Sequence, residues 1–343
     1  MANVRWAAMA AISAFGICVG TSAIAGMPPA NSAKARLAAA EAKANAKAFA
    51  SNEGILRWIN GYRLKPEPAR LPAAVQAMSA LGVFKDPETS GAYVGFMAGV
   101  IGDNQLETLS LIEDMFPLPP EDQVSLIKAV AWSGLPDWKT LLGSVAERMP
   151  ARKVLIERYL TGKMKPLAEL ALDQSPAVLD AHWGMYFATG RFDPILHIVR
   201  GLAWSKEEND VEKLTIAGFA KFTLASNAAR DPDLLKFLRR DIVHQPKSVV
   251  PALRDVIEAA ETFELAKLRR DAVAAIDDLK RKGPAKDRAI AGWAGAGATA
   301  VAIGCVAASA LGHVEFGIPC IVGGPLTQAA TKFLVPQLQS KPQ

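Results

Sequence analysis

Histidine and cysteine, the side chains that most often hold metal ions in proteins, are scarce in this sequence. The 343 residues include four His and three Cys, and neither an H-E-x-x-H nor a C-x-x-C motif occurs. Because zinc proteases and zinc ribbons depend on those spacings, both classes are disfavoured and no metal is expected. The sequence also lacks a Gly-rich loop following a strand pattern, so P-loop and dinucleotide-binding classes lack their signature and no cofactor is expected.

Long basic runs are missing as well. Lys and Arg number 39 against 34 Asp and Glu, so the formal net charge is only +5, and we expect this excess to be spread along the chain. Nucleic-acid binding normally leaves a clustered basic footprint with interleaved aromatic residues. We therefore expect no nucleic-acid partner.

The N-terminus has the features of an export signal. Met1 to Arg5 is short and positively charged, and residues 6–21 carry no charge. Ala23-Ile24-Ala25 places small residues at the positions that signal peptidase recognises, which predicts a signal peptide over residues 1–25 and cleavage before Gly26. The expected destination is across the inner membrane, in the periplasm. An uncleaved membrane anchor is the alternative.

Cysteine usage agrees with an oxidising compartment. Cys18 follows Ile17, whereas a lipoprotein signal has Gly or Ala at that position, so lipidation is disfavoured. Once the leader is removed, Cys305 and Cys320 are the remaining pair, and we predict a disulfide between them. Two small buried thiols are the alternative.

Proline positions mark the starts of helices, and no segment alternates clearly enough for a strand, so the sequence predicts an all-α fold. A capping side chain stands directly before proline at Asp86-Pro87, Ser175-Pro176, Asp193-Pro194 and Asp231-Pro232. Asp and Ser oxygens accept hydrogen bonds from the first helical turn, and proline at the first helical position loses none. Each pair therefore predicts a capped helix start.

Helix-start signals recur about every 16 residues from residue 86, so two helices make a unit of about 33 residues. That period is typical of helical hairpins stacked in a solenoid. The chain here resembles the tetratricopeptide and Sel1-like repeat proteins over residues 86–242. The residues that carry this resemblance are Trp183, Gly184, Tyr186, Gly190, Phe192, Pro194, Ile195, Val199 and Leu202.

Composition divides the exported chain into four regions that we treat as candidate domains. These are an Ala/Lys-rich N-terminal helix (26–51), a helical-repeat-like domain (52–246), a long amphipathic helix (247–283) and a Gly/Ala-rich apolar C-terminal hairpin (284–343). Gly283-Pro284 would end the long helix, because glycine allows a left-handed cap and proline stops the helix.

Candidate binding residues gather in the repeat-like hairpin. His182, Trp183 and Tyr186 form the most polar and aromatic spot there, and on the concave face of a solenoid they would contact a peptide or a sugar. His197 lies one helical turn after Asp193, a spacing that suits a general base and its orienting carboxylate. A buried aromatic core and a surface ion pair are the structural alternatives.

The C-terminal region contains an uncharged run of 24 residues, 289–312, which is long enough for a membrane-spanning helix. Small residues recur in it at every fourth position, a pattern that permits close helix packing. Few of its residues are large and apolar, so a tightly packed helical hairpin is the preferred interpretation and a membrane-associated segment is the alternative.

Three classes of function remain open from the sequence. The first, which we prefer, is an interaction module of the cell envelope that holds a protein or peptide partner. The second is an envelope enzyme that acts on glycan or peptide through a site that sequence spacing does not reveal. The third is a membrane-associated protein that inserts residues 289–312.

Overall fold

The computed structural model describes residues 30–86 and 89–262. The predicted leader, the uncharged segment 289–312 and the predicted Cys305–Cys320 disulfide lie outside this part of the chain. Two units can be distinguished, residues 1–43 and residues 44–343, and the helices from Asn52 onward belong to the second.

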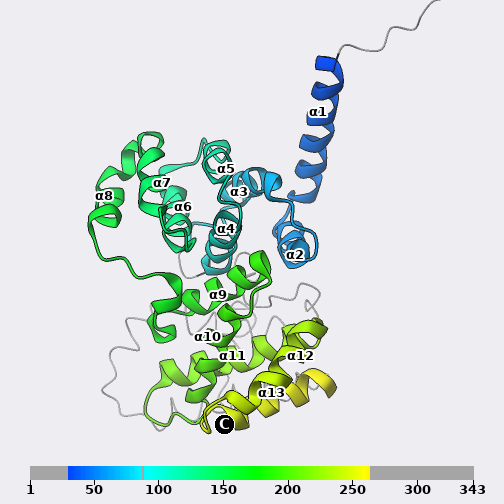
Figure 1. Cartoon of the computed structure of the whole chain (residues 1–343), viewed down its shortest axis with the longest axis vertical. Helices are drawn as coiled ribbons and strands as arrows, with labels where there is room; N and C mark the ends of the chain where they lie inside the picture. The colour runs from blue at the N-terminus through cyan, green and yellow to red at the C-terminus, as the bar shows by residue number, and fades with distance from the viewer. Residues whose placement is uncertain (1–29, 87–88, 263–343) are drawn as a thin grey trace, which may run out of the picture. The chain divides into compact units, whose positions relative to one another are not determined.

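The described residues form α-helices joined by turns and short 3-10 helices, without a β-strand, which confirms the predicted all-α class (Figure 1). The α-helices are α1 (Ala30–Ala48), α2 (Asn52–Tyr62), α3 (Leu71–Ala80), α4 (Gly91–Asp103), α5 (Thr108–Asp114), α6 (Pro120–Trp132), α7 (Trp138–Ser144), α8 (Lys153–Thr161), α9 (Pro176–Thr189), α10 (Asp193–Gly201), α11 (Val211–Ala228), α12 (Pro232–Asp241) and α13 (Val250–Thr262).

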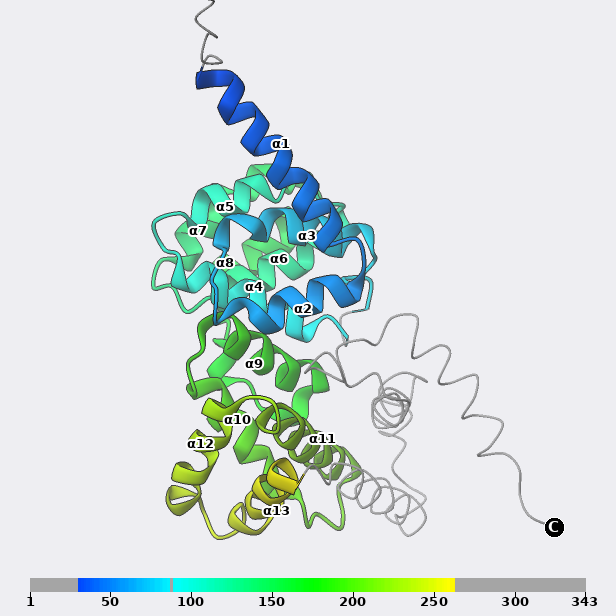
Figure 2. The same cartoon turned by 90° about the vertical axis from the view of Figure 1, so that its right-hand side faces the viewer.

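Helix α4 occupies the centre of the second unit, between α9 on one side and α6 on the other (Figures 1 and 2). Beyond α6 come α7 and then α8, while beyond α9 come α10, α11 and α13. Helix α4 is apolar around its whole circumference, and Phe96, Met97 and Ile101 are completely buried. Full burial of each such side chain stabilises the folded state by about 1.5–3 kcal/mol, so α4 contributes strongly to the stability of the core.

Glycines let α4 and α9 approach closely. Gly91, Gly95 and Gly99 stand at every fourth position of α4 and so lie on one face of it. A Cβ atom added to Gly95 would lie 1.9 Å from the carbonyl oxygen of Ala181, and one added to Gly184 would lie 2.0 Å from that of Ala92. The two backbones are therefore in direct contact, and larger residues would force them apart.

The predicted helix caps agree with the structure at two of the described positions. Ser175 accepts a hydrogen bond from the backbone N–H of Ala177, and Asp231 caps α12 in the same way. Asp193, by contrast, is the first residue of α10 and makes no capping hydrogen bond, because Phe192 occupies the N-cap position. Its carboxylate in the first turn still suits the helix dipole.

Two of the predicted regions are described only in part. The Ala/Lys-rich segment forms α1, and α13 covers the beginning of the predicted long amphipathic helix, whose remainder lies outside the described residues. No helix in the described part of the chain is both long enough and apolar enough to cross a membrane.

Candidate functional site

Helices α9 and α10 carry the four residues that the sequence suggested for binding. His182, Trp183 and Tyr186 are on α9 and are almost completely buried, whereas His197 on α10 is half-buried. A partner on the surface therefore has no direct access to the three α9 side chains. Binding of a partner by these residues remains a prediction. Their contacts with neighbouring helices show that the three α9 side chains pack in the interior of the protein.

Trp183 belongs to an aromatic cluster in the core. Its ring stacks on Phe187 at 5.8 Å between centroids and meets Tyr186 edge-on at 6.0 Å. The indole N–H donates a hydrogen bond of 3.0 Å to Oγ1 of Thr223 on α11. Since a buried indole N–H needs an acceptor, this bond ties α9 to α11 and orients the ring.

His182 and His197 stack on each other across the α9–α10 interface, with ring centroids 4.7 Å apart and planes inclined by 7°. Nη1 of Arg200 lies 3.3 Å from Nδ1 of His197. Because a guanidinium has no acceptor, Nδ1 of His197 must be the acceptor and its ring proton, when the ring is neutral, resides on Nε2. Nε2 of His182 has no hydrogen-bond partner among the described residues.

The environment of this pair favours neutral rings. Burial lowers the pKa of His182 to about 3, with further contributions from His197 and Arg200. Burial also lowers the pKa of His197, and Arg200 acts in the same direction while Asp193 opposes it. The predicted pairing of Asp193 with His197 is thus present only as a weak electrostatic influence, and stacked parallel rings do not direct their nitrogens toward a common metal ion.

Asp231 is the meeting point of three helices. Its Oδ2 accepts a hydrogen bond of 2.6 Å from the Tyr186 hydroxyl and lies 2.6 Å from Nη2 of Arg63, just after α2. Its Oδ1 accepts the backbone N–H groups of Asp233 and Leu234 at 3.1 and 3.2 Å. Burial and the bond to Asp231 raise the pKa of Tyr186. Both oxygens of this carboxylate have hydrogen-bond or ion-pair partners, so Asp231 connects neighbouring helices and is not available as a general base.

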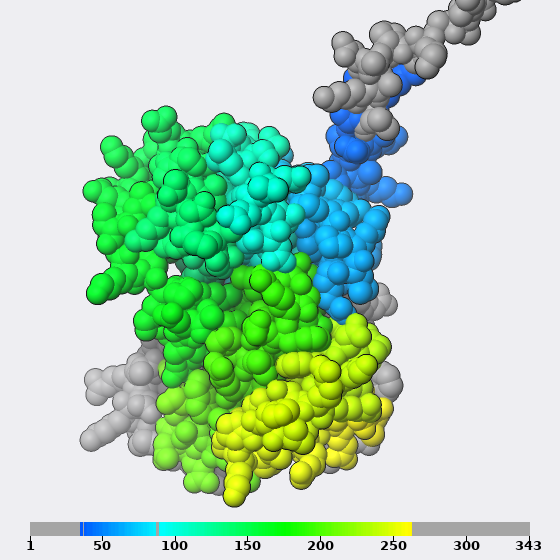
Figure 3. All heavy atoms as spheres, in the orientation of Figure 1, coloured from blue at the N-terminus to red at the C-terminus, as the bar shows by residue number. Residues whose placement is uncertain are grey.

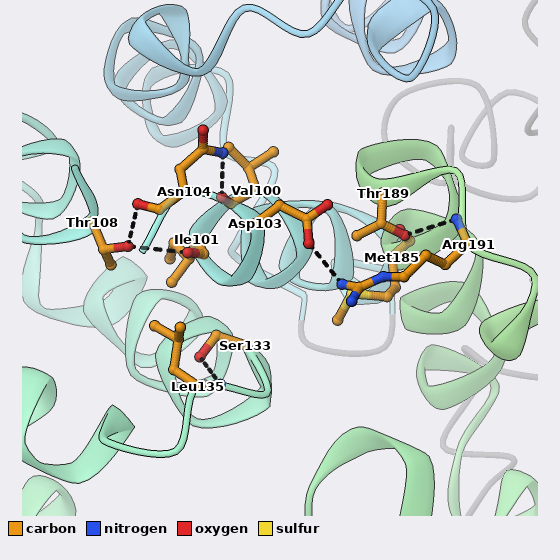
Figure 4. Close-up of polar contacts among 10 residues, drawn as sticks. All are labelled: Val100, Ile101, Asp103, Asn104, Thr108, Ser133, Leu135, Met185, Thr189 and Arg191. Atoms are coloured by element: carbon orange, nitrogen blue, oxygen red, sulfur yellow. Dashed lines mark hydrogen bonds and ion pairs between the residues drawn. The ribbon is translucent and has the colours of Figure 1, made fainter. Parts of the chain in front are cut away.

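A second polar cluster fixes the turn between α4 and α5 (Figure 4). Nδ2 of Asn104 donates to the Val100 carbonyl oxygen at 2.7 Å. Oγ1 of Thr108 lies 3.1 Å from the Ile101 carbonyl oxygen and 2.8 Å from that of Asn104, and the Glu107 N–H donates to the same Asn104 oxygen. These bonds occupy carbonyl groups that the end of α4 would otherwise leave unpaired, so the turn has a defined conformation.

The same end of α4 is attached to its two neighbours. Nη2 of Arg191, which follows α9, pairs with Oδ1 of Asp103 at 2.8 Å (Figure 4). Burial raises the pKa of Asp103, and Arg191 partly offsets that effect. On the other side, a Cβ atom added to Gly102 would lie 2.2 Å from the Ser133 carbonyl oxygen at the end of α6.

The turn that these contacts hold presents apolar side chains to solvent. Leu106 is fully exposed, and Leu109, three residues later in α5, is also exposed. Nearby acidic residues are Glu107, which is exposed, and Glu113, which pairs with Arg148 at 3.0 Å. We call Leu106, Glu107 and Leu109 the α4–α5 corner.

Within residues 30–86 and 89–262, no group of three His, Cys, Asp or Glu side chains is positioned to hold a metal ion. The chain matches no protein-family model, and its comparison with curated proteins and with solved structures gives no match. Any functional assignment therefore depends on the residues of this chain and their geometry.

Two features of the structure were not predicted from the sequence. The contact of Tyr186 with Asp231 joins residues 45 positions apart, and no local pattern announces it. The close approach of α4 and α9 did leave a signal, because Gly91, Gly95 and Gly99 form a G-x-x-x-G-x-x-x-G pattern. That pattern is familiar from membrane helices, but the same small-residue geometry applies wherever two backbones touch.

Proposed function

We propose that this chain is an interaction module of the cell envelope, a helical scaffold of stacked hairpins that holds a protein or peptide partner. The resemblance to helical-repeat proteins and the predicted signal peptide support this proposal. The packing of α6 on α7 and of α7 on α8 suits stacked hairpins, whereas the extensive contact of α4 with α9 joins helices that are not neighbours in the sequence.

The single observation that carries the proposal is the α4–α5 corner. An exposed leucine by itself is common on protein surfaces. Leu106 differs because it lies in a turn whose polar groups are paired with the end of α4, so the backbone that carries this exposed side chain has a defined conformation. A preorganised backbone segment loses little conformational entropy when a partner binds to it.

The chemistry of the corner also indicates the kind of partner. Leu106 and Leu109 would enter an apolar pocket, and the Glu107 carboxylate beside them would face Lys or Arg at its rim. Interfaces usually combine such an apolar centre with a charged rim. The buried residues of α9 would serve the module indirectly, by keeping α4 in position.

Site-specific photo-crosslinking in the producing cell tests the proposal. A photoreactive amino acid replaces Leu106 in one variant and Leu64, which is 74% exposed, in a matched control. We expect a discrete crosslinked protein at position 106 that is absent at position 64 and weakens when Leu109→Glu is added. Equal labelling at both positions, or no crosslink at position 106, would reject the corner as a partner site.

A further inference from the structure

Charge is distributed unevenly along the sequence of the described helices, so the expectation of an even spread was wrong. Residues 138–166, which include α7 and α8, contain seven basic and two acidic residues, a net charge of +5. The preceding stretch, residues 89–137, contains one basic and seven acidic residues, a net charge of −6. The modest charge of the whole chain therefore hides a strongly basic segment.

Some of the basic residues of this segment have partners inside the protein. Arg148 pairs with Glu113, and Nε of Arg152 donates to the Pro120 carbonyl oxygen at 2.6 Å. Nζ of Lys139 donates to the Leu160 carbonyl oxygen at 2.8 Å, which places a positive charge at the C-terminal end of α8. These three side chains attach α7 and α8 to each other and to the rest of the unit.

The remaining four basic residues are different. Lys153, Arg158, Lys163 and Lys165 are exposed and make no ion pair or side-chain hydrogen bond with any described residue. Glu157, one helical turn after Lys153, is the acidic residue of this stretch, so residues 153–165 carry a net charge of +3.

Apolar side chains lie among these charges. Val154 is 73% exposed, although it is a helical residue, and Met164 is partly exposed between Lys163 and Lys165. Ile156 and Tyr159 are the buried residues of α8 and form the face that packs against the rest of the protein. Val154 is consequently not needed for the core, and it lies on the same side of the helix as Arg158, one turn later.

Position in the fold makes this surface available. Helix α8 packs on α7, and α7 packs on α6, so α8 is the outermost helix of that series (Figure 1). Figure 3 shows the side chains of this region projecting at the margin of the molecule. We call Lys153, Val154, Arg158, Lys163, Met164 and Lys165 the basic edge.

We propose that the basic edge docks on the surface of an anionic phospholipid membrane, with Val154 and Met164 entering the headgroup region. Each Lys or Arg near such a surface strengthens binding about fivefold, and Lys and Arg stems reach between headgroups while their charges stay hydrated. A protein partner would instead call for buried aromatic or other large anchors, and no aromatic side chain is exposed between residues 153 and 165. The basic edge is separate from the α4–α5 corner, so this inference does not depend on the proposed partner site.

Vesicle co-sedimentation of the full exported chain tests the proposal. The probes are vesicles of phosphatidylcholine alone and vesicles that also contain phosphatidylglycerol. We expect binding only when phosphatidylglycerol is present, with an affinity that falls as salt rises. The triple variant Lys153→Gln, Arg158→Gln and Lys163→Gln should bind on the order of 100-fold more weakly.

Matched controls separate a specific surface from overall charge. Lys206→Gln, Lys236→Gln and Lys247→Gln remove the same charge from other exposed positions and should change the affinity less than about threefold, because distant charges are screened. Val154→Ser should weaken binding by about tenfold. Val243→Ser, at a valine that is 79% exposed, should leave it unchanged.

Three results would overturn the proposal. The first is an equal loss of affinity in both triple variants, or no loss in either. No loss in either variant, together with binding that salt does not weaken, would mean that another part of the chain attaches to the vesicle. The second is equal binding to phosphatidylcholine vesicles. The third is binding to a poly-glutamate peptide as tight as to the anionic vesicles, together with no effect of Val154→Ser, which would assign the basic edge to an acidic protein.

Discussion

The Tyr186 hydroxyl donates a hydrogen bond of 2.6 Å to Oδ2 of Asp231, and this contact joins α9 to the N-cap of α12. Arg63 shares the same carboxylate oxygen, and its guanidinium lies 5.6 Å from the centre of the Tyr186 ring. One carboxylate thus connects the end of α2, the last turn of α9 and the start of α12. Its removal should affect all three helices together.

Asp231→Ala should lower the free energy of unfolding by about 3 kcal/mol or more, because it removes a helix cap and leaves the Arg63 charge half-buried without its main partner. Tyr186→Phe should cost only about 1–2 kcal/mol, since Asp231 keeps its other three partners. Urea denaturation of both variants measures the difference. Equal decreases in the free energy of unfolding would show that the carboxylate contributes nothing beyond its bond to Tyr186.

Gly95→Ala should destabilise the protein by about 3 kcal/mol or more, because the new methyl group would collide with the Ala181 carbonyl oxygen on α9. Gly143→Ala is the matched control, since a Cβ atom at that position on α7 meets nothing within 4 Å. It should stabilise the protein by about 0.4–1 kcal/mol. Thermal unfolding of the pair checks the prediction, which a loss of stability in both variants, or in neither, would contradict.

His182 should make the protein less stable as pH falls below about 6.5. Its pKa in the folded state is lowered to about 3, so between pH 6.5 and pH 3 the unfolded chain binds a proton that the folded chain does not. Each pH unit in that window costs about 1.4 kcal/mol, and the loss of stability between about pH 6.5 and about pH 5 amounts to about 2 kcal/mol. Above pH 6.5 the effect vanishes.

Urea denaturation at both pH values, for the wild type and for His182→Leu, measures this contribution, because groups away from the pair titrate alike in both proteins and only His197, which stacks on His182, has altered surroundings. The variant should lose about 2 kcal/mol less than the wild type over the same interval. An identical pH dependence in the two proteins would mean that His182 is protonated in the folded state as easily as in the unfolded state.

The exported form should begin at Gly26, because Ala23-Ile24-Ala25 has the small residues that signal peptidase requires. N-terminal sequencing of protein from the producing cell measures this directly. Ala25→Arg, which blocks the cleavage site, should leave the leader attached. A wild-type protein that still starts at Met1 or Ala2 would refute the predicted cleavage and remove the support for an oxidising compartment.

Prediction of individual elements succeeded where the determining interactions are local. The starts of α9 and α12 were recognisable because Ser175 and Asp231 bond to backbone groups two or three residues away. Asp193 showed the limit of such signals, since a capping residue before proline became the first residue of its helix. Whether a side chain caps depends on the backbone that leads into the helix, and neighbouring elements set that path.

The candidate site was less predictable, because burial depends on which helices meet. His182 and His197 were selected separately, as a polar-aromatic spot and as a partner of Asp193, and the structure instead stacks them on each other. The aromatic residues Trp183 and Tyr186 suit either a groove or a core in sequence terms. The packing of α9 between α4 and α10 puts them in the core.

By itself the sequence determined that the described chain is helical, since helical periodicity and capping act within a few residues of each position. Tertiary structure alone decided which glycines bring α4 and α9 into contact and that Tyr186 and Arg63 share Asp231. It also decided that Lys153 and Val154 lie together on an outer helix without internal partners. The contacts of α4 with α9 and of Asp231 with Tyr186 and Arg63 join residues far apart in the chain, and only the packing of whole helices brings such residues together.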